Sequence, residues 1–169
     1  VEMAASHVIN QYMMLMALGL DGFAHASEAL AGAAWGRSDR DQFRRWVYLT
    51  GYWSLVASLF YALLLWLAVN DITDMLTDIE FLLITAGVLL PVVVALPLVS
   101  VWCFLFDGVY IGATAAASMM VTMGIAFVIY LFLLDPMTEQ WGLHGLWGAV
   151  LVFMAVRGLA QAIWYPALE

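Results

Sequence analysis

The 169-residue sequence is 66% hydrophobic and only 11% charged, with a formal net charge of −8. A soluble domain carries charge on about a quarter of its residues, so this composition excludes a soluble globular protein. The chain has five arginines and no lysine, which excludes nucleic acid as a partner, because nucleic-acid binding requires a basic surface.

Five apolar segments follow one another along the chain. Crossing a bilayer core of about 30 Å takes about 20 helical residues, and each segment comes close to or exceeds that length. Lipid cannot hydrogen-bond to the backbone, so helices are expected rather than isolated strands. The sequence therefore predicts one all-α domain over residues 1–169, a polytopic membrane bundle of about five transmembrane helices. The predicted spans are about 7–35, 46–69, 81–113, 118–134 and 146–164.

Prolines and acids mark the later connectors. The segment from 81 to 113 contains Pro91 and Pro97, and it is predicted to be one kinked or tilted helix, with two half-helices as the alternative. The preceding connector, residues 70–80, holds four acids and no basic residue. Asp135-Pro136 is predicted to stop the fourth helix, because proline removes a backbone donor.

The arginines predict the orientation. Four of the five lie within nine residues between the first two spans, at Arg37, Arg40, Arg44 and Arg45. Cytoplasmic loops carry the excess of arginine and lysine, so this connector is expected inside, the N-terminus outside and the C-terminus in the cytoplasm. The chain starts at Val1 without a basic leader region. That argues against a retained signal peptide and suggests a processed chain or a piece of a longer one.

The first span carries a polar stripe. Asp21, His25 and Glu28 are spaced i, i+4, i+7, which places them on one helix face, and Asn10 falls on the same stripe. Charged groups within a span face a partner or a wet cavity, and desolvation there favours proton exchange or cation contact. We therefore predict a substrate or cation cavity lined by Asn10, Asp21, His25, Glu28 and Asp107. The alternative is structural pairing with polar groups on neighbouring helices.

Depth suggests a second grouping. Glu28, Asp107 and Arg157 lie at similar distances from the inner ends of the first, third and fifth spans. We predict a buried charge network of Glu28, Asp107 and Arg157, which either braces the bundle or acts as an inner gate. Asp21 lies nearer the middle of the membrane with no arginine at its depth, so it is the better candidate for reversible protonation or cation contact.

The sequence contains no recognisable catalytic or metal-binding motif. His7 and His144 lie near predicted outer ends, no histidine pair has ligand spacing, and Cys103 is the single cysteine. We therefore predict no metal site. Phosphate-binding glycine loops and catalytic-triad signatures are likewise not found. The prediction is a protein that is not an enzyme and has no cofactor, apart from a coupling proton or sodium ion.

Four stretches carry a family resemblance. They are residues 20–30 (LDGFAHASEAL), 97–114 (PLVSVWCFLFDGVYIGAT), 144–147 (HGLW) and 157–159 (RGL). Together, and in this order, they resemble the multidrug and toxic compound extrusion (MATE) family, and within it the DNA-damage-inducible protein F (DinF)-like subgroup. The resemblance covers nearly the whole chain.

The resemblance implies a transporter of twelve helices in two lobes that exports organic cations and other amphipathic compounds against protons or sodium. It implies that this chain supplies helices eight to twelve, in the second lobe, so the N-terminal lobe and the seventh helix are absent. The acid most often tied to coupling lies in that missing lobe, whereas Asp21, Glu28 and Asp107 match second-lobe acids. Expected partners are the lipid bilayer, the missing N-terminal lobe of the same transporter, and amphipathic or cationic small molecules. The expected location is the bacterial inner (plasma) membrane.

One departure stands after the second stretch. Family members usually carry arginines beyond the equivalent of Gly112-Ala113-Thr114, whereas this chain continues with alanines at 115–117. The missing charges weaken the expected inside anchor of that loop and leave open a divergent or degenerate member.

Two functions are therefore carried forward. The first is part of a secondary active efflux antiporter, whose acidic stripe faces a central cavity. The alternative is a non-transporting membrane module, whose buried charges hold helices together or dock a partner. A third option, an intramembrane enzyme, lacks any nucleophile–base or metal-ligand arrangement.

Overall fold

The structure, a computed structural model that describes residues 2–76 and 90–168, is a bundle of long helices. The described residues contain no strand, so the predicted all-α bundle is confirmed. The elements are α1 (Glu2–Gly36), α2 (Arg40–Leu76), α4 (Leu90–Gly112), α5 (Ala116–Trp141), α6 (Leu143–Trp164) and the 3-10 turn η1 (Tyr165–Ala167).

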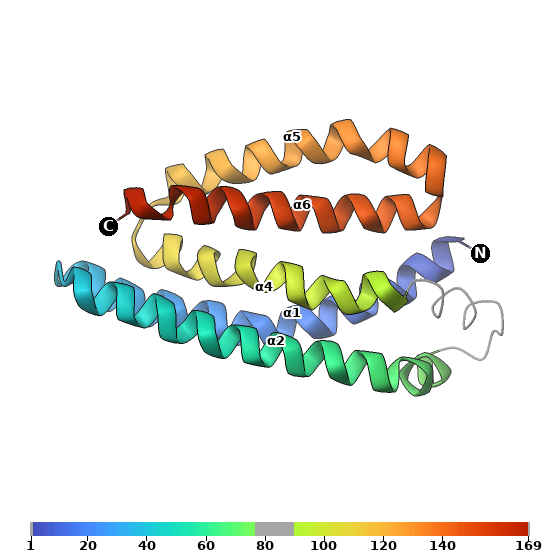
Figure 1. The fold of residues 1–169 in the computed structure, drawn as a ribbon, viewed down its shortest axis with the longest axis horizontal. Helices are drawn as coiled ribbons and strands as arrows, with labels where there is room; N and C mark the ends of the chain where they lie inside the picture. The colour runs from blue at the N-terminus through green and yellow to red at the C-terminus, as the bar shows by residue number, and fades with distance from the viewer. Residues whose placement is uncertain (1, 77–89, 169) are drawn as a thin grey trace.

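Helix α4 lies at the centre of the bundle. It packs against α1 and α2 on one side and against α6 on the other, and α5 packs mainly on α6. Helices α1, α4 and α6 run in the same direction, with α2 and α5 antiparallel to them (Figure 1). Charged residues at matching heights on α1, α4 and α6 therefore share one depth in the bundle.

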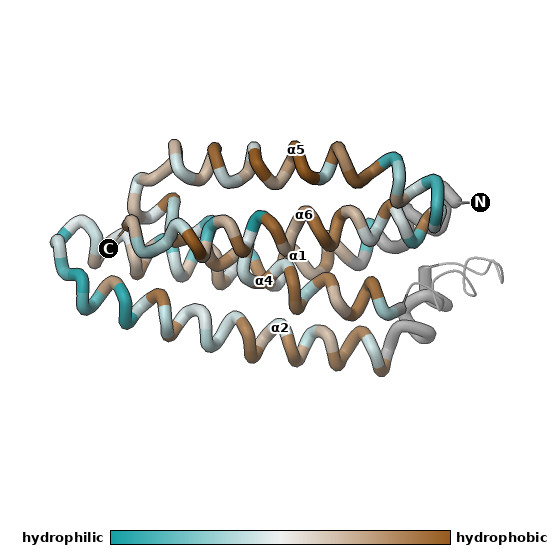
Figure 2. Tube along the Cα trace, turned by 45° about the horizontal axis from the view of Figure 1, so that its top comes forward, coloured by the Kyte–Doolittle hydropathy of each residue, from teal (hydrophilic) through white to brown (hydrophobic). Residues whose placement is uncertain are grey.

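Four described helices are long and apolar enough to cross a membrane. Helix α1 is long enough but is not among them, and it carries Asp21, His25 and Glu28 in its middle. Hydrophilic residues gather at the α1–α2 turn and at the α5–α6 turn, with hydrophobic stretches between them (Figure 2). This banding is that of an integral membrane protein. The four segments are Arg40–Leu67, Pro91–Gly112, Ala116–Trp141 and Leu143–Ala167.

The second helix begins earlier than residue 46, where the apolar run starts. Asp39 accepts a hydrogen bond on Oδ1 from the backbone N–H of Gln42, at 3.0 Å, which is the bond that an N-cap residue makes. Ser38 completes the turn from α1 with a φ of 55°. The helix therefore starts at Arg40, and three of the clustered arginines lie on its first turns.

The prediction that Asp135-Pro136 stops the fourth helix is wrong. Helix α5 continues through Pro136 to Trp141 and turns at Gly142, whose φ of 54° favours glycine. A proline within a helix removes one backbone donor, and a membrane helix tolerates that loss where neighbours or water cover the freed carbonyl. The end of the helix is set by the glycine instead.

Only part of the third predicted span, 81–113, can be compared with the structure, because 81–89 lie outside the described residues. From Leu90 to Gly112 the segment is one helix with Pro97 inside it, as the prediction of a single kinked or tilted helix requires for these residues. The hydroxyl of Ser58 on α2 donates to the carbonyl oxygen of Pro97 at 2.7 Å. This bond ties α2 to α4 at the point where the proline interrupts the helix ladder.

Helices α1 and α4 approach each other at two glycines. A Cβ atom on Gly108 would lie 2.1 Å from the carbonyl oxygen of Ala24, and one on Gly112 would lie 2.6 Å from that of Glu28. The hydroxyl of Ser27 donates across the same contact to the carbonyl oxygen of Leu105, at 3.2 Å. Close backbone packing at small residues is the usual way in which membrane helices associate.

Candidate functional site

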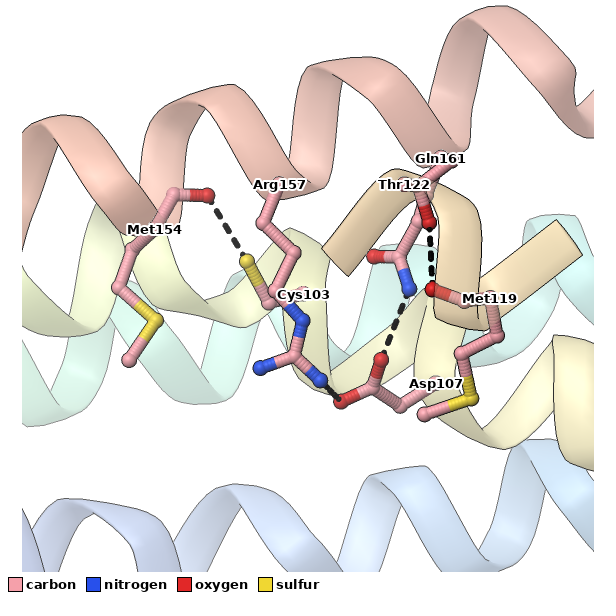
Figure 3. A network of polar contacts seen from close by, with 7 residues as sticks. All are labelled: Cys103, Asp107, Met119, Thr122, Met154, Arg157 and Gln161. Carbon is pink, nitrogen blue, oxygen red and sulfur yellow. Dashed lines mark hydrogen bonds and ion pairs between the residues drawn. The ribbon is translucent and has the colours of Figure 1, made fainter. Parts of the chain in front are cut away.

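A polar network joins α4 to α6 in the middle of the bundle. Helix α4 presents Cys103 and Asp107 toward α6, and α6 presents Arg157 and Gln161 in return (Figure 3). Tyr110 of α4 also bonds to α6. Because the two helices run in the same direction, residues fifty or so apart in sequence meet at one depth.

Both carboxylate oxygens of Asp107 are bound. Arg157 donates from Nη2 to Oδ2, and Gln161 donates from Nε2 to Oδ1 at 2.8 Å. The hydroxyl of Tyr110 in turn donates to the backbone carbonyl of Gln161 at 2.8 Å. One turn away, the thiol of Cys103 donates to the carbonyl oxygen of Met154 at 2.8 Å. The network thus fixes α4 against α6 at several successive points.

This network is largely shielded from solvent. The side chains of Arg157 and Asp107 are only 11% and 19% exposed, and Gln161 is fully buried. Two of its polar atoms, Arg157 Nε and Gln161 Oε1, have no hydrogen-bond partner among the described residues. A buried ion pair of this kind resists separation, because removing one member leaves an uncompensated charge. Chemically, the network is suited to bracing two helices.

The polar stripe of α1 is exposed, in contrast to the buried network between α4 and α6. Asn10 and Asp21 are exposed, and the side chains of His25 and Glu28 are 79% and 41% exposed. Among the described residues, the stripe has one acid–base contact, between His25 Nδ1 and Glu28 Oε2 at 3.6 Å. Within the described part of the chain, Asp21 makes no hydrogen bond or ion pair.

The packing of α1 explains why the stripe is open. One side of the helix, which includes Leu20, Ser27 and Ala31, is buried against the bundle. A second side, with Phe23 and Leu30, faces α2 across a cavity of about 270 Å³. The stripe occupies the remaining side, which no described helix covers. Carboxylates on a membrane-embedded surface require water or a polar partner, and the described helices supply no such partner for Asp21.

The structure divides the predicted site residues into two groups. Asn10, Asp21, His25 and Glu28 share the open side of α1, whereas Asp107 lies in the α4–α6 network with Arg157. Glu28 contacts His25 rather than Arg157.

Gln161 was missed by reasoning from charge, although its spacing of four residues after Arg157 places both on one face of α6. The described residues contain no group of three or more His, Cys, Asp or Glu side chains that could hold a metal ion.

Comparison with known proteins gives two matches. The model of the MatE family matches residues 1–137. The DNA damage-inducible protein F of Escherichia coli (strain K12) is 40% identical to this chain over 164 residues, which cover 95% of this chain and 35% of that protein. The chain therefore spans about a third of the length of this curated relative. No solved structure matches.

Proposed function

Because the chain belongs to the MatE family, we propose that it is part of a secondary active efflux antiporter. In this proposal it contributes helices eight to twelve of the second lobe and works with an N-terminal lobe of the same transporter. The exported compounds are amphipathic or cationic small molecules, and the driving ion is a proton or sodium. The transporter is a carrier in the bacterial inner membrane and performs no enzymatic step.

The observation that carries this proposal is the open polar stripe of α1. Asp21 and His25 project from a helix whose other two sides are packed on α4 and α2. A carboxylate facing hydrocarbon costs a few kcal/mol or more, so this side must face water or polar protein. A water-filled cavity shared with the other lobe meets that requirement, and it brings Asp21 to the path of a cationic compound.

The residues of the stripe have different tasks in this proposal. Asp21 is the exchanging carboxylate, because no arginine or histidine of the described chain neutralises it. His25 Nδ1 and Glu28 Oε2 lie 3.6 Å apart, so these two polar side chains contact each other rather than Asp21. Binding of a cation at the stripe and protonation of Asp21 compete for the same negative charge, which is the basis of exchange.

The Asp107–Arg157 ion pair favours the alternative function, in which buried charges hold helices together, for the contact between α4 and α6. A network in which both carboxylate oxygens are already bound suits a structural brace. In our proposal the lobe therefore contains both elements: a brace between α4 and α6 and an exchange surface on α1.

The orientation follows from the arginine cluster. We propose that residues 37–45 lie in the cytoplasm, with the N-terminal end of α1 outside. A reporter that is active only in the cytoplasm, fused after residue 38, is expected to be active. An active periplasmic reporter at the same position would reverse the orientation.

The test of transport is Asp21→Asn in the natural protein that carries this sequence. We expect export driven by a proton or sodium gradient to be lost while the protein still reaches the membrane and keeps its thermal unfolding temperature. Asp41→Asn is the matched control, because it removes the same charge from the exposed first turn of α2. Normal export by Asp21→Asn would remove this residue from the mechanism. Equal loss in both variants would show that overall charge matters and the stripe does not.

A further inference from the structure

A second polar site lies at the end of the bundle where α1 turns into α2 and α6 finishes (Figure 1). A cavity of about 430 Å³ opens there, between the α1–α2 turn and the C-terminal residues. Its wall includes Trp35, Phe43 and Leu168, and its polar rim includes Ser38, Asp39 and Arg40. No step of the proposed transport cycle uses this cavity.

The α1–α2 turn beside the cavity carries a basic cluster in an otherwise acidic chain. Residues 37–45 contain four arginines and two aspartates, whereas the whole chain carries −8. Arg40 is exposed at the cavity and, among the described residues, makes no hydrogen bond or ion pair. Asp39 lies on the same rim and keeps its negative charge there, while its Oδ1 accepts the backbone N–H of Gln42. The guanidinium of Arg40 makes no bond to it and is available to an anion, and its planar donors match a phosphate group.

The wall of the cavity is aromatic. Phe43 is buried with its ring centroid 5.6 Å from that of Trp35 and 6.1 Å from that of Tyr165, and it is stacked on the latter. Trp35 remains partly exposed at the membrane end of α1. Indole rings at this level of a membrane protein lie among headgroups and the first methylenes of lipid chains.

From the Arg40 rim, the aromatic wall and the position at the ends of membrane-spanning helices, we propose that this cavity binds the headgroup of an anionic phospholipid. The phosphate contacts Arg40 and the hydroxyl of Ser38, and the glycerol and first methylenes lie on the exposed part of Trp35. A free anion would contact only the polar rim, whereas a lipid also contacts the aromatic wall. The bound lipid links the α1–α2 turn to the C-terminal end of α6, and the neighbouring arginines attract anionic lipid to this leaflet.

The experiment is native mass spectrometry on the full natural protein, delipidated in detergent and then titrated with phosphatidylglycerol or phosphatidylcholine. We expect phosphatidylglycerol to bind more tightly and Arg40→Gln to weaken it about tenfold, the effect of losing one charge-assisted hydrogen bond. Arg45→Gln is the matched control, because it removes the same charge from an exposed site outside the cavity. Ala167→Trp tests the cavity itself, since it fills the space without changing any charge.

Loss of affinity in Arg40→Gln and Ala167→Trp, with little change in Arg45→Gln, supports the site. Equal loss in the two arginine variants would show diffuse attraction to the cluster and overturn it. Displacement of the lipid by inorganic phosphate at matched concentration would assign the rim to free anions and also overturn the lipid proposal. Thermal unfolding of each variant excludes misfolding as the cause. Export is not the readout, so the result is independent of the transport proposal.

Discussion

The carboxylate of Asp107 on α4 is neutralised by the guanidinium of Arg157 on α6, fifty residues further along the chain. Because this acid already has its cation within the same bundle, its charge holds two helices together. Asp21 has no such cation in the described part of the chain. These two acids of the bundle therefore differ, one braced and one open, and each predicts a different response to mutation.

Replacing Arg157 with methionine is expected to destabilise the bundle strongly. The substitution keeps much of the side-chain volume but leaves Asp107 charged and largely buried, with only Gln161 still donating to it. Breaking a buried pair in this way costs about 3–5 kcal/mol in the free energy of unfolding. The measurement is thermal or denaturant unfolding of the full protein in detergent.

The control for this prediction is the double variant Arg157→Met with Asp107→Leu. Removing both charges should recover much of the lost stability, because no uncompensated charge remains. A single variant as stable as the unmodified protein would contradict the bracing role. Failure of the double variant to recover any stability would show that packing dominates and the ion pair does not.

Replacing Gly108 with alanine is expected to separate α1 from α4. The added Cβ would lie 2.1 Å from the carbonyl oxygen of Ala24 and 2.2 Å from Ser27 Oγ, so the helices must move apart. Overpacking of this kind costs about 1–3 kcal/mol. The readout is a lower unfolding temperature in detergent.

Gly124→Ala is the matched comparison for Gly108→Ala. Nothing lies within 4 Å of a Cβ built at Gly124, and alanine favours the helix by about 1 kcal/mol. This variant should unfold at the same temperature or a higher one. Similar behaviour of the two alanine variants would mean that the close α1–α4 contact contributes nothing to stability.

Features of the fold that depend on local sequence could be predicted. Lipid requires long apolar helices, and the helical period alone places Asp21, His25 and Glu28 on one face. The end of α5 could not be read from Pro136, because a proline stops a membrane helix only where its freed carbonyl stays uncovered. The glycine at 142 carried the relevant signal, since the turn requires a positive φ.

Depth along a span could be estimated from the sequence, but the direction of a side chain around the helix axis could not. Glu28, Asp107 and Arg157 lie at similar depths, yet which of them meet depends on how α1, α4 and α6 are rotated against one another. The close α1–α4 contact through Gly108 and Gly112 sets part of that rotation. Gln161 escaped notice because a neutral amide in an apolar run has no charge to mark it.

The 169-residue segment reconstituted alone is expected to transport nothing. Its stripe is open on the side where the proposed partner lobe belongs, so it forms one wall of a cavity with no opposite wall. The measurement is flux of a fluorescent organic cation from liposomes under a proton or sodium gradient, with the full natural protein as the positive control. Circular dichroism establishes that the segment is helical in the same liposomes. Gradient-driven flux through the segment would contradict the two-lobe proposal.

A cysteine at position 25 is expected to react with a membrane-impermeant maleimide when the full natural protein is embedded in lipid. The stripe should face a water-filled cavity, and the thiolate that reacts with maleimide forms only in water. Phe132→Cys on α5 is the comparison. Its side chain is 79% exposed on a helix that carries no charged residue from 116 to 134, so lipid should cover it and labelling should be slow. The native Cys103 is buried and should contribute little background, which a Cys103→Ala variant measures.

Fast labelling at 25 with slow labelling at 132 places water along the stripe. If both positions stay unlabelled, the stripe is closed by protein or lipid, and the exchange role of Asp21 loses its physical basis.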